Sequence, residues 1–145
     1  MNRYMICLDG SNASERGFHY LEALAMTMKE KVEVYLLNVV DTKLINKLEV
    51  DTNPEGTRHS LSKRALDEYS KSLTVNNIRN HELLIDTKTS VKDTILDEIE
   101  KNKIDMVIVG HAPQSKFKRI VDGSSISSVC DHLLKKANCP ILIFK

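Results

Sequence analysis

The sequence contains little cysteine and no metal-ligand spacing. Its three cysteines, Cys7, Cys130 and Cys139, are too few and too far apart for a disulfide framework, and none lies in a Cys-x-x-Cys or Cys/His pattern. We expect reduced thiols that act as small buried hydrophobes. The five histidines never recur at an interval such as i, i+4 on one helix, so the sequence predicts no metal site.

Two further absences exclude whole classes of protein. No stretch approaches the roughly 18 apolar residues of a membrane helix, and the opening MNRYMICLDG lacks the apolar core and cleavage site of a signal peptide. The 21 Lys and Arg residues against 20 Asp and Glu leave a formal net charge of +1, which disfavours general nucleic-acid binding. We therefore expect a cytoplasmic protein with no membrane and no nucleic-acid partner.

The 145 residues predict a single domain, 1–145, in which strands and helices alternate. Short apolar runs rich in β-branched residues indicate five strands, at 4–8, 32–40, 83–85, 106–109 and 141–144. Segments of helical period lie between them, with apolar stripes over 18–28, 61–73, 91–99 and 126–134. This alternation predicts an α/β fold, a doubly wound five-stranded parallel sheet with helices on both faces.

Helix starts and one long connection complete the predicted organisation. Asn12 and Ser90 each precede an acidic residue at capping-box spacing, and the Ser124-Ser125 pair can cap the last helix. The connection over 41–60 is unusually long for a compact domain and holds Pro54 and Gly56. Such a segment is either a lid over a ligand or plain disorder.

The ends of the first and fourth predicted strands are the candidate ligand site. The first strand runs into Asp9-Gly10-Ser11, and the fourth runs into Gly110 followed by HAPQSKFKRIVDGSS. If the strand order is 3-2-1-4-5, these ends meet at the point where the sheet reverses its direction of growth, and ligands of doubly wound sheets bind there.

The residue types around these two strand ends suit a ligand that combines a phosphate with a base or a sugar. Backbone N–H groups and the positive helix end at Gly123-Ser124-Ser125 attract phosphate, while Asp9 can accept hydrogen bonds from a base or sugar. Positive charge next to this site comes from Lys116, Lys118 and Arg119. In the alternative interpretation Gly123 permits a turn, the serines only cap a helix and Asp9 binds backbone.

Four segments together resemble the universal stress protein family over essentially the whole chain. YMICLDGSNAS is similar to that family's first strand and turn, VYLLNVVD to its second strand, NKIDMVIVG to its fourth, and LLKKANCPILIFK to its last helix and strand. The resemblance implies an adenine-nucleotide-binding-like α/β fold, the strand order 3-2-1-4-5, and usually a dimer.

The family's ATP-binding pattern is Gly, two residues, Gly, nine residues, Gly, then Ser or Thr. Gly110, Gly123 and Ser124 match it, but Pro113 replaces the second glycine. Proline has no N–H to offer a phosphate and restricts the backbone. Asp122 adds a like charge unless Mg2+ bridges it to the phosphates.

By resemblance, Asp9 and Val39 contact adenine, and Gly110 lies against the ribose and phosphates. The resemblance assigns the binding of the phosphates to Gly123, Ser124 and Ser125. Counting back from Cys139-Pro140 instead aligns the family's Gly-Ser with Ser127-Ser128, one helical turn later. We favour Gly123-Ser124, which keeps the spacing from Gly110 and implies a last helix about one turn longer than usual.

The sequence thus predicts a small stress-response regulator that binds ATP or a related adenine nucleotide, with Mg2+ only when nucleotide is bound. The alternative is a dimeric interaction or signalling module that has lost nucleotide binding, as Pro113 suggests. We assign no catalytic residues and expect at most weak ATP hydrolysis. The apolar segment 141–144 would be a bare edge strand in this order, which favours a homodimer through that edge.

Overall fold

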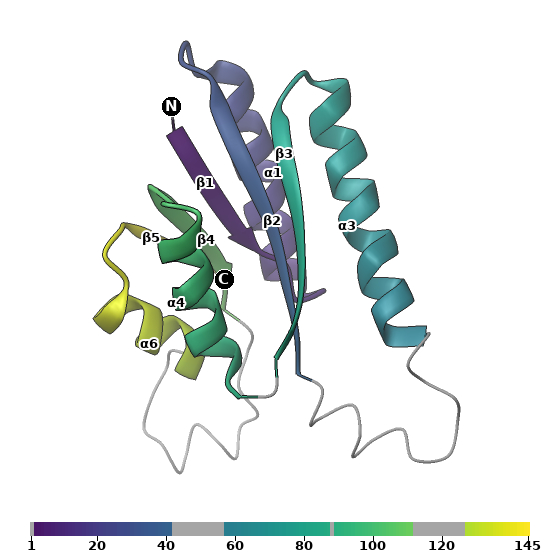
Figure 1. Cartoon of the computed structure of the whole chain (residues 1–145). Helices are drawn as coiled ribbons and strands as arrows, with labels where there is room; N and C mark the ends of the chain where they lie inside the picture. Colours follow the sequence, from purple (N-terminus) through teal and green to yellow (C-terminus); the bar gives the residue numbers. More distant parts are fainter. Residues whose placement is uncertain (1, 42–56, 88, 112–126) are drawn as a thin grey trace.

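The structure, a computed structural model, describes residues 2–41, 57–87, 89–111 and 127–145. Strands and helices alternate along this part of the chain (Figure 1). The strands are β1 (Asn2–Cys7), β2 (Val32–Asp41), β3 (Arg79–Thr87), β4 (Met106–Gly110) and β5 (Ile141–Phe144), and the helices are α1 (Asn12–Thr27), α3 (Thr57–Val75), α4 (Val91–Lys101) and α6 (Ser128–Lys136). In the ranges described, no helix is both long enough and apolar enough to cross a membrane.

The five strands form one parallel sheet in the order β3-β2-β1-β4-β5, which confirms the predicted fold class and strand order. In this order β1 lies between β2 and β4, and the end of β1 pairs with both neighbours, Cys7 opposite Leu37 and opposite Val109. The carboxyl ends of β1 and β4 are therefore adjacent, at the point where the sheet reverses its direction of growth.

Two apolar cores lie on the two faces of the sheet. Alternate residues of a strand point to opposite faces, so Ile6 of β1 packs with α1 and α3, whereas Met5 packs with α4 and α6. Figure 1 shows these two pairs of helices on opposite sides of the sheet. Phe18 and Ile99, from two of the predicted helix stripes, are almost fully buried, as are strand residues such as Met5. The stripe predicted over 61–73 is partly wrong, because Leu61 is 57% exposed and Leu66 takes the buried position instead.

The helix caps confirm one prediction and correct two. Ser90 caps α4 as predicted, since its side chain accepts the Asp93 N–H at 3.4 Å. The N-cap of α1 is Ser11, one residue before the predicted Asn12. The N-cap of α6 is Ser127, so the prediction that Ser124-Ser125 caps the last helix is wrong. A longer last helix is also wrong, because α6 begins at Ser128.

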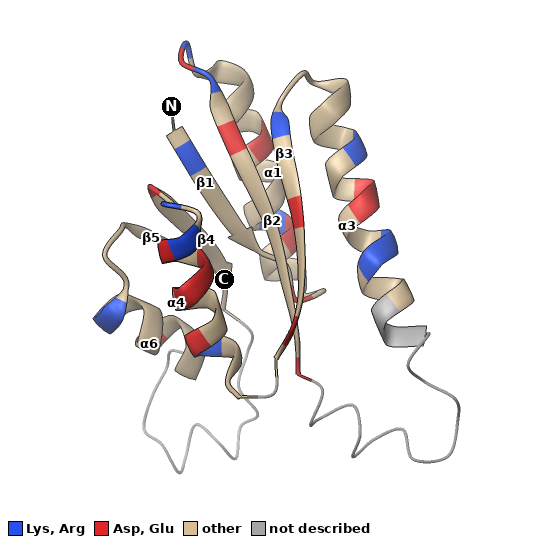
Figure 2. Cartoon of the chain, in the orientation of Figure 1, with Lys and Arg blue, Asp and Glu red and all other residues tan. Residues whose placement is uncertain are grey.

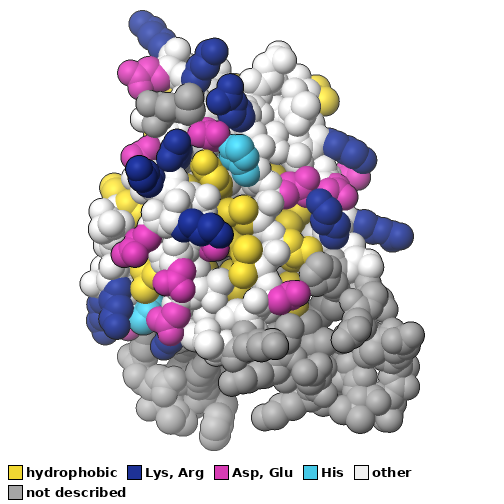
Figure 3. Space-filling model, viewed as in Figure 1, with side chains coloured by type: hydrophobic (Ala, Val, Ile, Leu, Met, Phe, Trp, Pro, Cys, Tyr) yellow, Lys and Arg dark blue, Asp and Glu magenta, His cyan; other side chains and the backbone are white. Residues whose placement is uncertain are grey.

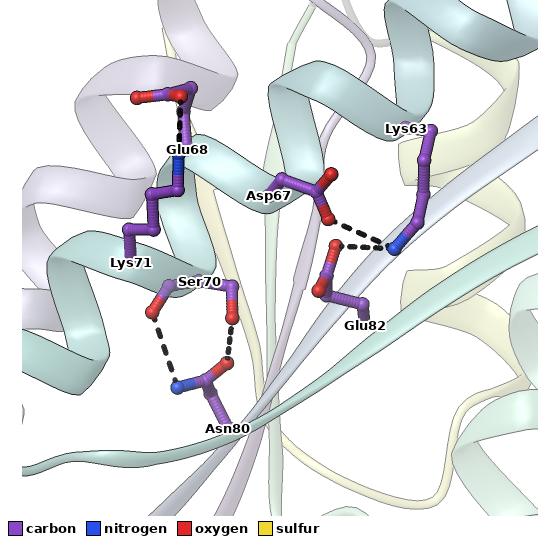
Figure 4. Close-up of polar contacts among 7 residues, drawn as sticks. All are labelled: Lys63, Asp67, Glu68, Ser70, Lys71, Asn80 and Glu82. Carbon is purple, nitrogen blue, oxygen red and sulfur yellow. Dashed lines mark hydrogen bonds and ion pairs between the residues drawn. The ribbon is translucent and has the colours of Figure 1, made fainter.

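Strand β3 is longer than its apolar run of 83–85 and begins at Arg79. Its polar residues alternate between the two faces of the sheet: Asn80 and Glu82 contact α3, as Figure 4 shows, whereas Arg79 and His81 lie on the other face. Lys63 of α3 lies between two carboxylates, 2.9 Å from Asp67 and 3.1 Å from Glu82 of β3. Ser70 of α3 donates a 2.7 Å hydrogen bond to Asn80. Of the connection 41–60, residues 42–56 lie outside the described residues.

Candidate functional site

The turn that follows β1 holds Asp9 at the carboxyl edge of the sheet. Leu8 N–H donates to the Leu37 carbonyl at 2.8 Å, which keeps the chain in the sheet up to this residue. Gly10 then takes a φ of 81°, a left-handed conformation that side chains disfavour. Asp9 Oδ1 accepts the Ser11 N–H at 2.9 Å, so one carboxylate oxygen stabilises the turn into α1.

Gly110 ends β4 against the first turn of α1. A Cβ atom at this position would lie 2.7 Å from the Ser14 backbone N and 3.1 Å from the Ala13 carbonyl carbon. Neither backbone atom can move without moving the helix. Gly110 therefore lets the end of β4 and the start of α1 approach each other. This packing role is independent of any role of Gly110 in ligand binding.

His111 connects the end of β4 to the start of α6. Its backbone N–H donates to the Phe144 carbonyl at 2.6 Å, and its ring Nδ1 accepts the Ser127 N–H at 3.2 Å. Ser127 Oγ in turn accepts the Cys130 N–H at 3.3 Å. An imidazole nitrogen accepts a hydrogen bond only without its own proton, so this arrangement needs an unprotonated Nδ1 on His111.

A pocket of about 150 Å³ opens between these strand ends and the starts of α4 and α6. Its lining is mostly aliphatic, with a carboxylate, a hydroxyl and bare backbone at Asp9, Ser127 and Gly110. The lining residues are Cys7, Leu8, Asp9, Leu37, Val39, Val91, Ile95, Val109, Gly110, Ser127 and Val129. Such a lining suits a flat, largely apolar ring with polar atoms at its edge.

The Cys7 thiol in the pocket lining is unreactive. Burial, with a smaller contribution from the Asp9 carboxylate, raises the pKa of Cys7 to about 12. Burial also raises the pKa of the Cys130 and Cys139 thiols, and all three cysteines are free. A thiol held neutral is neither a nucleophile nor a metal ligand, so Cys7 contributes an apolar wall.

The structure brings three of the predicted site residues into this one pocket: Asp9 from the turn after β1, Val39 from β2 and Gly110 from β4. Gly123, Ser124 and Ser125 lie outside the described residues, as do Pro113, Asp122 and the basic cluster Lys116, Lys118 and Arg119.

Sequence reasoning did not assign Val91 and Ile95 to the site, although both belong to the predicted apolar stripe of a helix. Their place in the pocket depends on how α4 packs against the sheet. The sequence pointed to Ser127 only through the alternative alignment, in which the family's Gly-Ser is counted back from Cys139-Pro140. That alignment is the sequence feature that could have identified Ser127 as a site residue.

Comparisons with known proteins agree with this fold. The model of the universal stress protein family matches residues 1–145. Among solved structures, hypothetical protein MJ0577 superposes with a TM-score of 0.80 at 20% identity, covering 99% of this chain and 95% of that one. None of the curated proteins matches the chain.

Two other solved structures carry adenine nucleotides. A universal stress protein family protein from Arabidopsis thaliana with AMP bound has a TM-score of 0.66 at 17% identity, covering 100% of this chain and 92% of that chain. A universal stress protein in complex with cAMP has a TM-score of 0.65 at 15% identity, covering 98% of this chain and 94% of that chain. With the family model matching its whole length, the chain belongs to the universal stress protein family.

Proposed function

We propose that this protein binds an adenine nucleotide, with the base in the pocket at the carboxyl ends of β1, β2 and β4, and that it acts as a small cytoplasmic stress-response regulator. The observation that carries the proposal is the convergence of Asp9, Val39 and Gly110 with Ser127 on one pocket. Aliphatic walls stack on the base, and the Asp9 carboxylate accepts a hydrogen bond from it. The AMP and cAMP bound by two structures of the same fold support this ligand class.

The first turn of α6 provides the phosphate side of the proposed site. Backbone N–H groups at a helix start, together with the positive end of the helix dipole, favour an anion. Ser127 carries a hydroxyl at this position, directly on the pocket wall. We propose ATP as the nucleotide, accompanied by Mg2+, with phosphate contacts extending to Gly123, Ser124 and Ser125 and to the positive charges of Lys116, Lys118 and Arg119.

Isothermal titration calorimetry with ATP, ADP, AMP and cAMP, with and without Mg2+, tests the proposal. Val39→Trp fills the pocket and should weaken binding about tenfold or more, equivalent to about 1.4 kcal/mol. The matched control, Val75→Trp, places the same side chain on an exposed position of α3, distant from the pocket, and should leave affinity unchanged.

Two results would contradict the proposal. Equal affinities of Val39→Trp and wild type would place the nucleotide elsewhere. Absence of binding by wild type to all four nucleotides would favour the alternative, an interaction module of the same fold without nucleotide. Thermal unfolding of both variants checks that the substitutions leave the fold intact.

We further propose a homodimer that pairs through β5. This four-residue strand, Ile141–Phe144, is apolar throughout and lies at the sheet edge. Tyr20 of α1, 47% exposed, packs on Phe144 with ring centroids 5.4 Å apart and widens the apolar surface. Bare apolar edges tend to pair with a second strand, and two-fold symmetry closes such a contact.

A further inference from the structure

A second cavity, of about 330 Å³, lies at the opposite end of the sheet from the proposed nucleotide pocket. It is lined by residues from 25–26, 28–32 and 76–79, and we call it the amino-end cavity. These residues come from the last turn of α1, the turns that follow α1 and α3, and the starts of β2 and β3. None of them belongs to the pocket described above.

The cavity lining carries three cations, Lys29, Lys31 and Arg79. Within the described residues none of the three forms an ion pair, whereas Lys63, Lys71, Lys101 and Lys135 all pair with a carboxylate. The only acidic residue of the lining is Glu30, whose carboxylate accepts a hydrogen bond from the Asn2 side chain at 3.4 Å. Figure 2 marks basic residues along the ribbon at this end of the molecule, and Figure 3 shows Lys and Arg side chains on its surface there, with acidic side chains among them.

Two exposed apolar residues belong to this region: Met26 lines the cavity, and Val75 directly precedes the lining residue Asn76. Met26 near the end of α1 is 59% exposed, and Val75 at the end of α3 is 81% exposed. Exposed methionines adapt to varied partners.

We propose that the amino-end cavity is a docking surface for an acidic segment of a partner protein. Carboxylates of the segment pair with Lys29, Lys31 and Arg79, and an aliphatic or methionine side chain packs on Met26. Cations that form no ion pair in the described residues, next to exposed apolar groups, match a peptide that carries both carboxylates and apolar side chains. Of the three cations, Arg79 also acts electrostatically on the Glu33 carboxyl. A phosphate backbone would pair with the same cations but would leave the exposed Met26 without an apolar partner.

The position of this surface has a functional consequence. It lies at the amino ends of the strands, whereas the proposed nucleotide pocket lies at their carboxyl ends. A partner bound at the amino-end cavity leaves the pocket open, so the protein can hold both at once.

Selection of random 12-residue peptides displayed on phage against the immobilised full chain tests the proposal. Selected peptides should be enriched in Asp and Glu together with Leu, Ile, Met or Phe. A synthetic copy of the strongest peptide should shift the backbone amide signals of residues 28–32 and 75–79 in NMR spectra. Its affinity should fall about tenfold or more in the variant Lys29→Glu/Lys31→Glu/Arg79→Glu, and should fall as salt is raised.

The matched control is Arg64→Glu/Lys92→Glu/Lys136→Glu, which changes the net charge by the same amount at positions outside the cavity and without ion pairs in the described part of the chain. It should bind the peptide within about twofold of wild type. Met26→Ser/Val75→Ser should also weaken binding while keeping every charge. Circular dichroism of each variant verifies folding.

The proposal is overturned if no peptide is enriched over the bare support, if selected peptides lack acidic residues, or if both triple variants lose equal affinity. It is also overturned if polyuridylate or inorganic phosphate shifts the amides of residues 28–32 and 75–79 and the acidic peptide does not. Nucleotide affinity, measured separately on the same variants, is expected to stay at the wild-type value.

Discussion

Gly110 illustrates how one residue can serve both structure and function. The family resemblance assigns it to the ribose and phosphates, and it lines the proposed pocket. The structure shows that this position also requires glycine for packing, because a Cβ atom at Gly110 would lie 2.7 Å from the backbone of α1. Substitution at Gly110 therefore tests packing at least as much as binding.

We expect Gly110→Ala to destabilise the fold by about 1–3 kcal/mol, the usual effect of an added methyl group in a tightly packed site. Urea unfolding measured by circular dichroism gives this number. Gly10→Ala is the comparison, because a Cβ at Gly10 meets no atom within 4 Å and only its φ of 81° opposes the substitution. Equal stability of Gly110→Ala and wild type would contradict the close approach of β4 and α1.

At the scale of elements, the start of α6 is held by contacts from other parts of the chain. Ser127 caps the helix, and the His111 ring, sixteen positions earlier, accepts the Ser127 N–H. The cap thus joins the end of β4 to α6, next to the pocket. A serine pair with good capping character, Ser124-Ser125, lies only a few residues before it, and local chemistry alone does not choose between them.

Ser127→Ala should destabilise the protein by about 1 kcal/mol through loss of the N-cap, the typical effect of removing a capping serine. Ser128→Ala is the matched control, because Ser128 is exposed in the first turn and, among the residues that the structure describes, the N-cap of α6 is Ser127. Thermal and urea unfolding give the comparison. If Ser128→Ala proved the more damaging substitution, the assigned start of α6 would be wrong.

Glu33 joins three strands on the α4 face of the sheet. Its carboxylate lies 2.6 Å from His81 Nε2 of β3 and 3.4 Å from Arg3 Nε of β1, and the residue is 7% exposed. The hydrogen bond with His81, assisted by the positive charges of Arg3 and Arg79, holds the pKa of the Glu33 carboxyl below its ordinary value of 4.5. A lowered pKa in the folded state means that the charged carboxylate stabilises the fold.

This stabilisation is fully present above pH 4.5 and is lost as the pH falls through the lowered pKa of the folded state. Glu33→Gln should therefore be less stable than wild type at pH 7, by roughly 1.5–3 kcal/mol for a charged hydrogen bond, and the difference in unfolding free energy should narrow below pH 4.5. Urea unfolding across pH 3–7 measures this difference. Glu68→Gln, at an exposed ion pair of α3, should show a much smaller effect.

At the scale of the whole molecule, the sheet order leaves one short apolar edge and one long polar edge. At the other side of the sheet β3 carries Arg79, Asn80 and Glu82, and charged side chains protect an edge from pairing. Strand β5 has no charged residue in its four positions. The proposed homodimer follows from this asymmetry.

We expect light scattering at micromolar concentration to give a mass near twice the 16.4 kDa of the chain. The carbonyls of Pro140 and Phe144 accept hydrogen bonds from β4, so the N–H of Ile143, out of phase with them, faces away from the sheet. Ile143→Pro removes that N–H and should shift the mass toward the monomer, whereas Ile143→Val should not. A monomeric wild type would overturn the proposed dimer.

The sequence by itself determined the α/β fold class with helices on both faces of the sheet, because the periodicity of apolar residues reports which faces of each element are buried. Uninterrupted runs such as 106–109 are typical of strands covered on both sides, and the helix stripes indicated the two layers. Asp9 and Gly110 could be predicted as neighbours only with the strand order 3-2-1-4-5, which the family resemblance implies. Val39 is assigned to the site by that resemblance alone.

Only the tertiary structure decided features that depend on contacts between distant segments. The polar start of β3 is a strand because β2 pairs with it from Arg79 onward, and no local pattern encodes that pairing. The choice of Ser127 as the cap depends on where His111 lies at the end of β4. The amino-end cavity exists because α1 and α3 end side by side. Sheet order and helix packing bring these two ends together, and the periodicity of the sequence does not predict it.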